Sequence, residues 1–162
     1  MRRTLGILTV AMLALWLTAM PASAAGTWTW PVVGPIIRGF DPPDSPFGSG
    51  HRGIDIAAPV GTIVRAPAPG VVSFAGSVGG QLFVTVDLGG GLLSTASFLS
   101  ERLVRKGDAV IQGQPIGRSG SGHPGDFQAN LHFGVRLDGT YVDPLRYLTS
   151  ASVVDLIRLA VI

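Results

Sequence analysis

The sequence predicts an all-β fold: a two-sheet sandwich or barrel of short antiparallel strands, with a short helix at the C-terminus. Three observations indicate this class. Short segments rich in Val, Ile, Thr and Phe recur from Ile54 onward. Glycine clusters separate them, and the chain of 162 residues holds 23 glycines. Only the C-terminal segment has the periodicity of an amphipathic helix, so short strands joined by turns account for the remainder.

The N-terminus has the features of a secretory signal peptide. Arg2 and Arg3 precede an apolar run at 5–19, and the Ala-Ser-Ala sequence at 22–24 has the form of a cleavage site. We therefore assign residues 1–24 to a signal peptide and expect a secreted protein of the cell wall or periplasm. A retained N-terminal membrane anchor is the alternative, although the apolar run is shorter than the ~20 residues that span a bilayer.

Cleavage of the signal peptide changes the charge balance. Without Arg2 and Arg3, ten of the twelve Lys and Arg residues remain, and they equal the ten Asp and Glu residues in number. A formally neutral chain does not support a basic groove for nucleic acid. The chain has no cysteine, so any metal site must use His and carboxylate ligands.

The predicted elements of the mature chain follow in order. Residues 25–46 form a Pro-rich arm of extended chain or loops, because proline interrupts regular elements. Residues 47–148 form the β domain, with a turn that opens at Asp143-Pro144 and reaches Tyr147. Gly79-Gly80 and the glycines of 89–91 are the expected hairpin connections. The predicted strands are 62–66, 71–75, 82–88, 92–98 and 131–137.

The last residues, 149–162, are predicted to form a helix. Ser150 or Ser152 can cap it, and its apolar face is made by aliphatic side chains from Val153 to Val161. Its charged residues and its length argue against a membrane span. Whether the helix packs on the domain or on a partner is left open.

Two segments carry residues that can bind a metal. In the segment from Asn130 to Arg136, polar and apolar residues alternate, which predicts a strand with His132 beside Asn130 on its polar face. In the other segment, His51 and Asp55 lie four positions apart, about 13 Å in a straight strand, so a shared ion needs a bend. Gly53 permits one.

With His132, these residues give zinc three ligands and leave a fourth position for water, which is the arrangement of a catalytic site. Each piece is weak evidence alone, since a single histidine in a strand is more often hydrogen-bonded than metal-bound.

The order of the motifs adds a resemblance. Residues 50–62, which begin Gly-His-Arg-Gly-Ile-Asp, closely resemble the first metal-binding segment of LytM/lysostaphin-type zinc peptidases of the M23 family. Residues 66–75, 104–117 and 131–144 resemble the later segments of that family in the right order. The resemblance covers roughly 47–148. It implies Zn²⁺ bound by His51, Asp55 and His132, in a duplicated-hybrid β fold of two sheets. It also implies a groove for the stem or cross-bridge peptides of bacterial peptidoglycan.

The sequence departs from the family at two positions. Family enzymes carry two further histidines, in Tyr-x-His-Leu and at the start of His-Leu-His, and these positions fall on Phe98 and Asn130 here. General acid–base catalysis is typically worth ~10²–10⁴ in rate, and phenylalanine cannot supply it. The Asn130 amide can donate a hydrogen bond to an oxyanion but cannot shuttle a proton. The site therefore resembles one that holds zinc with weak or absent hydrolysis.

A substitute for the missing histidines is His123, in a glycine-rich loop at 120–126. Such a loop can bring a proton shuttle over a rigid sheet. The simpler interpretation, which the sequence favours, is an exposed loop histidine without a role. Asp126 and Glu101 are alternative bases, although nothing in their spacing places them near the zinc.

Three functions are therefore weighed. The first is an exported domain that binds zinc and peptidoglycan peptides with little hydrolysis and serves another cell-wall hydrolase. The second is an active metalloendopeptidase that uses His123. The third is a lipoyl- or biotinyl-type carrier, suggested by the segment 104–117, but Lys106 is the only lysine and lacks the flanking pattern of a carrier. The residues that bind the substrate are not predicted.

Overall fold

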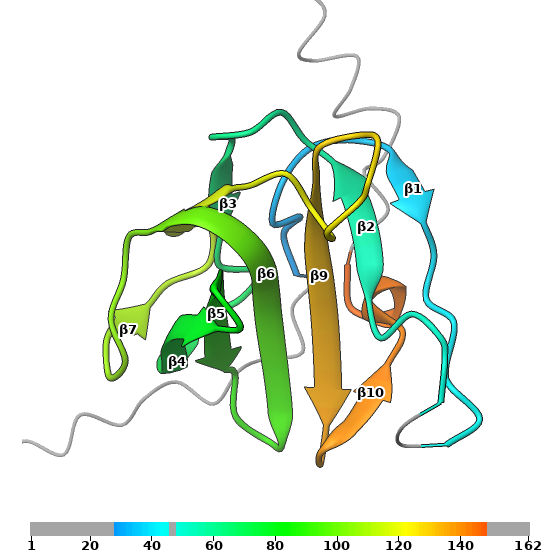
Figure 1. Cartoon of the computed structure of the whole chain (residues 1–162). Coiled ribbons are helices and arrows are strands. Elements are labelled where there is room, and N and C mark those ends of the chain that lie inside the picture. Colours follow the sequence, from blue (N-terminus) through cyan, green and yellow to red (C-terminus); the bar gives the residue numbers. More distant parts are fainter. Residues whose placement is uncertain (1–27, 46–47, 149–162) are drawn as a thin grey trace, which may run out of the picture.

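The structure, a computed structural model, describes residues 28–45 and 48–148 (Figure 1). The predicted signal peptide and C-terminal helix lie outside the described residues. Those described form ten strands and one short 3₁₀ helix, and the all-β class is confirmed. All the pairings between these strands are antiparallel. The elements are β1 (Ile36–Arg38), β2 (Ile54–Ala57), β3 (Ile63–Arg65), β4 (Gly70–Val78), β5 (Gln81–Asp87), β6 (Leu92–Arg102), β7 (Ala109–Val110), β8 (Pro115–Ser119), β9 (Asn130–Leu137), β10 (Thr140–Val142) and η1 (Pro144–Arg146).

The strands are joined in the order β1-β2-β9-β6-β5-β4-β7, with β10 beside β9. The longest strand, β6, connects this row to a second one. Its first half, up to Ser97, pairs with β9, and its second half, from Leu99, pairs with β8, which in turn pairs with β3. In Figure 1 the ribbon of β6 curves over between these two groups of strands. The two rows are thus hydrogen-bonded parts of one curved sheet.

The five predicted strands correspond to β3, β4, β5, β6 and β9. Both expected glycine connections are confirmed: Gly79-Gly80 joins β4 to β5, and the glycines of 89–91 join β5 to β6. All five of these glycines have positive φ, between 57° and 81°, which residues with a Cβ adopt at a cost. The short strands β1, β7 and β8 have little pattern of their own and depend on partners distant in the chain, whereas the short β10 forms a hairpin with β9.

The Pro-rich arm contains more regular structure than its sequence predicts. Its segment Ile36–Arg38 pairs with β2 as an edge strand, directly after Pro35, where the missing N–H of proline is tolerated. Trp28 and Val32 are buried in the core. The arm is therefore packed on the domain.

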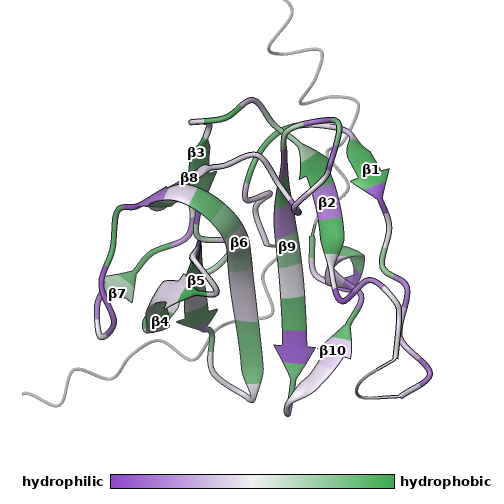
Figure 2. Ribbon diagram, in the orientation of Figure 1, coloured by the Kyte–Doolittle hydropathy of each residue, from purple (hydrophilic) through white to green (hydrophobic). Residues whose placement is uncertain are grey.

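The core lies between the two rows of strands and is made of aliphatic side chains with two large aromatic ones, Trp28 and Phe133. All four residues of β2 are buried, and Leu131, Phe133 and Val135 of β9 are at most 1% exposed. Figure 2 shows hydrophilic and hydrophobic residues alternating along β9, as the sequence predicts. The alternation directs His132 to the opposite face.

The described part of the chain ends with the turn that the sequence predicts. Asp143 caps η1, and its Oδ1 accepts a hydrogen bond from the Leu145 N–H at 3.0 Å. The turn reaches Tyr147, whose ring stacks on that of Trp28 with centroids 4.7 Å apart. Within residues 28–45 and 48–148, no helix is long and apolar enough to cross a membrane.

Candidate metal centre

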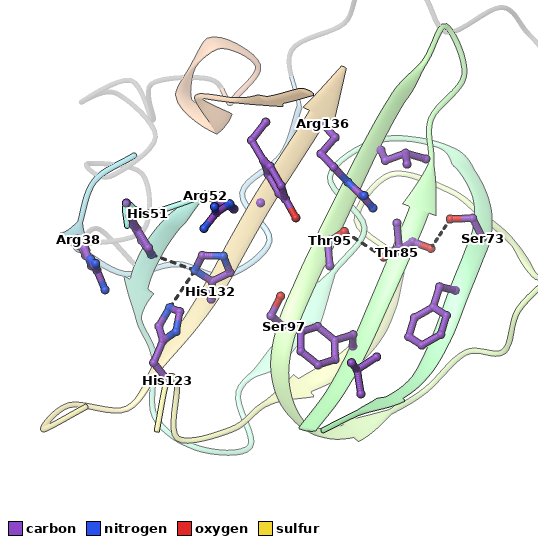
Figure 3. A pocket seen from close by; sticks show the side chains of 17 residues that line it. Arg38, His51, Arg52, Ser73, Thr85, Thr95, Ser97, His123, His132 and Arg136 are labelled. Carbon is purple, nitrogen blue, oxygen red and sulfur yellow. Dashed lines mark hydrogen bonds between the residues drawn. The ribbon is translucent and has the colours of Figure 1, made fainter. Parts of the chain in front are cut away.

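Strand register places two of the predicted ligands side by side. Asp55 of β2 lies directly opposite His132 of β9, so both side chains point to the same face of the sheet. His51 precedes β2 and forms an isolated bridge with Asp41 of the arm. The chain bends at Arg52-Gly53, as a shared site requires, and the bend brings His51 over the same face. Figure 3 shows the imidazoles of His51, His132 and His123 turned toward one another.

The ligand atoms meet around one carboxylate oxygen. Asp55 Oδ1 lies 2.8 Å from His132 Nδ1 and 3.1 Å from His51 Nε2, and these two nitrogens are 3.1 Å apart. Donor atoms of His51, Asp55, His123 and His132 all lie within 4.8 Å of one another. Among the described residues these four form the one such group.

The arm orients His51. Its Nδ1 lies 2.7 Å from the carbonyl oxygen of Gly39. Because a carbonyl oxygen only accepts, Nδ1 carries the proton and donates a hydrogen bond to that oxygen. The lone pair of Nε2 then faces Asp55. A ligating histidine typically donates its other N–H to a carbonyl in this way, and the arrangement therefore fits a metal ligand.

The electrostatics also suit a cation. Burial by itself raises the pKa of Asp55, but the hydrogen bond with His132 and the nearby imidazoles outweigh it, and the pKa lies below its ordinary value. Burial lowers the pKa of His132 more than Asp55 raises it. An ionised carboxylate and a neutral imidazole are the protonation states that zinc binds.

Gly53 serves the site by its small size as well as by its position at the bend. A Cβ added there would lie 2.4 Å from the Phe133 carbonyl oxygen and 2.9 Å from the His132 ring. Only glycine lets the bend lie this close to β9. The sequence suggests flexibility as the reason for this glycine, whereas the structure shows close approach.

The structure places His123 at the centre and not on the open surface. Its side chain is 26% exposed, and its Nε2 lies 3.1 Å from His132 Nδ1 and 3.3 Å from Asp55 Oδ1. The expectation of an exposed loop histidine is therefore wrong. Sequence patterns do not indicate this position, because the 120–126 loop has no periodicity that predicts where the His123 side chain points.

The two alternative bases lie elsewhere in the hydrogen-bond network. Glu101 pairs with Arg118, 3.1 Å away on β8. Asp126 accepts hydrogen bonds through Oδ2 from the His123 backbone N–H and from the Asn130 side chain, both at 2.8 Å. Asp126 thus braces the loop that carries His123.

Asn130 is buried, with 1% exposure, and its amide is turned toward this loop. Its Nδ2 donates to Asp126 Oδ2 at 2.8 Å and to the Gln128 carbonyl at 2.9 Å. Both N–H groups are thereby engaged, which leaves none for the oxyanion that the sequence assigned to it. Its Oδ1 is buried with no hydrogen-bond partner among the described residues.

Phe98 has a left-handed backbone, with φ 57°, within the irregular part of β6 where pairing passes from β9 to β8. An aromatic residue in this region is an outlier that the surroundings must stabilise. Its ring lies 4.5 Å from the His123 ring and 6.1 Å from that of His132, between centroids. Phe98 therefore covers one side of the candidate centre.

A groove of about 660 Å³ leads from the histidines across the face of the sheet (Figure 3). Sequence patterns did not single out its lining, because the polar side chains come from six strands (β1, β4, β5, β6, β9 and β10) and from loops, and meet only once the register is set. The residues that line it are Arg38, Gly50, His51, Arg52, Ser73, Phe74, Val78, Phe83, Thr85, Leu93, Thr95, Ser97, His123, His132, Gly134, Arg136 and Tyr141.

Comparison with known proteins gives concordant results. Residues 49–144 match Peptidase family M23. The chain is 38% identical over 127 residues to a lipoprotein NlpD/LppB homolog of Pseudomonas aeruginosa, and 35% identical over 133 residues to the murein hydrolase activator NlpD of Escherichia coli. These matches cover 77% and 81% of this chain but only 41% and 33% of the relatives, so the chain spans well under half of their length.

Among solved structures, a variant of the catalytic domain of the prophage-encoded M23 protein EnpA from Enterococcus faecalis matches with a TM-score of 0.58 and 31% identity. The match covers 73% of this chain and 96% of that one. Nothing in these similarities supports a carrier role for Lys106, which lies in the exposed turn before β7. The fold, the order of the motifs and these matches agree: this chain belongs to peptidase family M23.

Proposed function

We propose that the chain is an extracytoplasmic M23 domain that binds Zn²⁺ through His51, Asp55 and His132 and engages peptidoglycan peptides with weak or no hydrolysis. One observation carries the proposal. Three zinc-competent atoms converge within 3.1 Å of one another, while the two neighbouring positions that hold histidines in family enzymes hold Phe98 and Asn130. The site thus has side chains that can bind zinc, whereas Phe98 and Asn130 cannot transfer a proton.

The donor set fits zinc, which favours imidazole nitrogen and carboxylate oxygen. A bound zinc ion supplies Lewis acidity toward a carbonyl or a water molecule. Hydrolysis also needs a group that takes a proton and one that returns it to the leaving amine. Phe98 has no such group, and the two N–H groups of Asn130 are engaged by Asp126 and Gln128. The chain's own residues therefore support binding far better than turnover.

The groove supports an extended peptide as the occupant. Arg38, Arg52 and Arg136 line it along the side of β1, β2 and β9, and hydroxyl groups of Thr95 and Ser97 line the floor on β6. Guanidinium groups favour carboxylates, and peptidoglycan stem peptides carry them. The groove ends at His51, His123 and His132, so a bound peptide would run up to the metal centre (Figure 3).

The relatives support a regulatory role and an exported location. The name of the Escherichia coli relative states that it activates murein hydrolases, and the Pseudomonas aeruginosa relative is named as a lipoprotein. With the predicted signal peptide at 1–24, they support a domain in the cell wall or periplasm that serves another hydrolase. Because only part of each relative is matched, this partner is part of the proposal.

A second candidate is an active metalloendopeptidase with His123 as proton shuttle. The observation in its favour is the position of His123 Nε2, 3.1 Å from His132 Nδ1 at the end of the groove. At this distance, however, His123 Nε2 lies within the group of ligand atoms. A proton shuttle would instead lie next to that group and face the substrate.

Elemental analysis and zymography test the proposal together. We expect the purified mature chain to hold one equivalent of zinc, and Asp55→Ala or His51→Ala to lose it. Asp87→Ala, which changes an exposed carboxylate outside the cluster, serves as the matched control and should keep the metal. Peptidoglycan pull-down should retain the protein, and gels that contain peptidoglycan should show no clear zone. Unchanged zinc in Asp55→Ala rejects the site. A clear zone abolished by His123→Ala establishes the second candidate instead.

A further inference from the structure

We propose that His123 is the fourth protein ligand of the metal, and that Phe98 and Asn130 are the positioning residues that hold it there. The centre is then closed, with three imidazoles and one carboxylate and no position for a catalytic water. This inference rests on the proposed zinc site and goes beyond it, because it replaces the open position of a peptidase with a side chain of the same chain.

The distances among the four donor atoms carry the geometric argument. Four donors at about 2.0–2.1 Å from one zinc ion lie about 3.3 Å apart in a regular tetrahedron. Five of the six donor pairs here lie 2.8 to 3.3 Å apart, and His123 Nε2 takes part in two of them. Without a cation, His132 Nδ1 would face three close neighbours, more than its single proton or lone pair can satisfy. One cation satisfies all four donor atoms at once.

Asn130 anchors the loop on which His123 lies. The Asn130 amide donates to Asp126 Oδ2, and the same oxygen accepts the backbone N–H of His123. The Asp126 N–H in turn donates to the His123 carbonyl at 3.0 Å. Asp126, held by the buried Asn130 side chain, therefore fixes both the N–H and the C=O of His123. A histidine at position 130 could not make the paired donation from one nitrogen to Asp126 and Gln128.

Phe98 packs against His123 itself. The centroid of its ring lies 4.5 Å from that of the His123 imidazole, and the centroid of the Phe83 ring lies 5.6 Å from that of Phe98. Apolar contact between these two tilted rings limits the rotation of His123 away from the cluster and excludes water from that side. The two positions that carry histidines in family enzymes thus both contact the His123 loop.

Gly122 offers a way to move His123 without removing it. A Cβ at Gly122 would lie 2.3 Å from Asn130 Nδ2, and the residue has φ +90°. Gly125 in the same loop has φ +93°, but a Cβ there meets nothing within 4 Å. Gly122→Ala and Gly125→Ala therefore impose similar backbone strain, and only the first also displaces the anchor.

Cobalt substitution of the mature chain tests the closed centre. Co²⁺ in the wild type should give the absorption of a four-coordinate ion, and acetohydroxamate, a bidentate metal ligand, should leave the spectrum unchanged. His123→Ala should bind metal at least about ten-fold more weakly and should take up acetohydroxamate, with a change in the cobalt spectrum. Asn130→Ala, Phe98→Ala and Gly122→Ala should admit the probe as well, with an affinity loss of about ten-fold, typical of outer partners. Gly125→Ala should behave as the wild type does.

X-ray absorption of the zinc-loaded wild type gives a readout that does not depend on any variant. Three imidazoles and one carboxylate oxygen, with no water, are expected. Two imidazoles, or uptake of acetohydroxamate by wild type and His123→Ala alike, would overturn the fourth ligand while leaving the proposed zinc site intact. A wild type that binds neither metal would overturn both.

Discussion

A single oxygen atom organises the site at the scale of residues. Asp55 Oδ1 lies within 3.3 Å of nitrogens from three histidines, and it is 2% exposed as a residue. A buried charge of this kind must be compensated, and here the imidazoles or a cation do so. The neighbouring residues set the positions of these groups. Gly53 leaves room for the bend beside β9, the Gly39 carbonyl orients His51, and Asn130 anchors the loop that carries His123.

The lowered pKa of His132 predicts how the metal-free domain responds to pH. Burial, the main cause, makes the folded state bind this proton more weakly than the unfolded chain does. The stabilisation is thus fully present above about pH 6.5 and is lost as the pH falls through the lower folded-state pKa. Asp55, whose pKa is also lowered, acts in the same direction at more acidic pH. We expect the free energy of unfolding in urea with EDTA to decrease as the pH falls from about 7 to about 5.

His132→Gln is the control for this pH dependence, since glutamine cannot titrate and should flatten the slope in that range. A domain that gains stability on acidification would contradict the direction of the shift.

Gly53→Ala tests the close approach of the bend to β9. The added methyl group would meet the Phe133 carbonyl and the His132 ring, and overpacking of this kind costs about 1–3 kcal/mol. We expect that loss in urea unfolding, together with weaker zinc binding, because the His132 ring must shift. Gly39→Ala is the matched control: a Cβ there meets nothing within 4 Å, and the carbonyl that holds His51 is kept. Equal losses in the two variants would show that Gly53 matters only for backbone conformation.

At the scale of elements, the alternation of side chains along β9 serves both the core and the candidate site. Its apolar side chains, Leu131, Phe133 and Val135, fill the core, while His132 points to the groove. The strand lies between β2 and β6, so a slip of one residue would bury His132 and expose the core face. The register that stabilises the fold is therefore the register that builds the site.

Leu131→Ala tests how much the apolar face of β9 contributes to the core. Leu131 is fully buried, and removal of a buried leucine side chain typically costs 2–5 kcal/mol. Leu137→Ala, at the end of the same strand with 36% exposure, should cost less than about 1 kcal/mol. Urea unfolding monitored by tryptophan fluorescence compares the two. Comparable losses would mean that the core on this face of β9 extends to the exposed end of the strand.

At the scale of the whole molecule, the Pro-rich arm ties the two ends of the domain together. The ring of Trp28 stacks on that of Tyr147, and the backbone N–H of Trp28 donates to the Tyr147 carbonyl at 3.0 Å. Further along, β1 extends the sheet beside β2, and Gly39 and Asp41 reach His51. The arm thus connects the packing of the chain ends to the orientation of one ligand.

Trp28→Ala should destabilise the domain strongly. Trp28 is 6% exposed and loses both its core contacts and the ring stacking, and truncation of a buried tryptophan typically costs about 3–5 kcal/mol. Trp28→Phe keeps an aromatic ring at this place and should lose clearly less. Thermal unfolding followed by circular dichroism distinguishes them, and a Trp28→Ala variant with wild-type stability would show that the arm is dispensable.

Sequence reasoning reached the all-β class, five of the ten strands within residues 28–45 and 48–148, and the His51, Asp55 and His132 group. These features are written locally: β strands show as runs of branched and aromatic residues, turns as glycine pairs, and the metal segments as short motifs. Counting from neighbouring motifs also predicts that Phe98 and Asn130 stand where the family pattern has two further histidines, and this stays a prediction.

The tertiary structure decided what those residues do. That His123 faces the candidate metal centre, that Asn130 donates to Asp126 and that the Phe98 ring contacts the imidazole of His123 depend on a loop and on a bulged strand, whose directions no periodicity encodes. The short strands β1 and β8 likewise form only because distant partners supply their hydrogen bonds. Local pattern fixes which residues can bind a metal, whereas strand register and loop anchoring, which are long-range and cooperative, decide how many of them meet at one point.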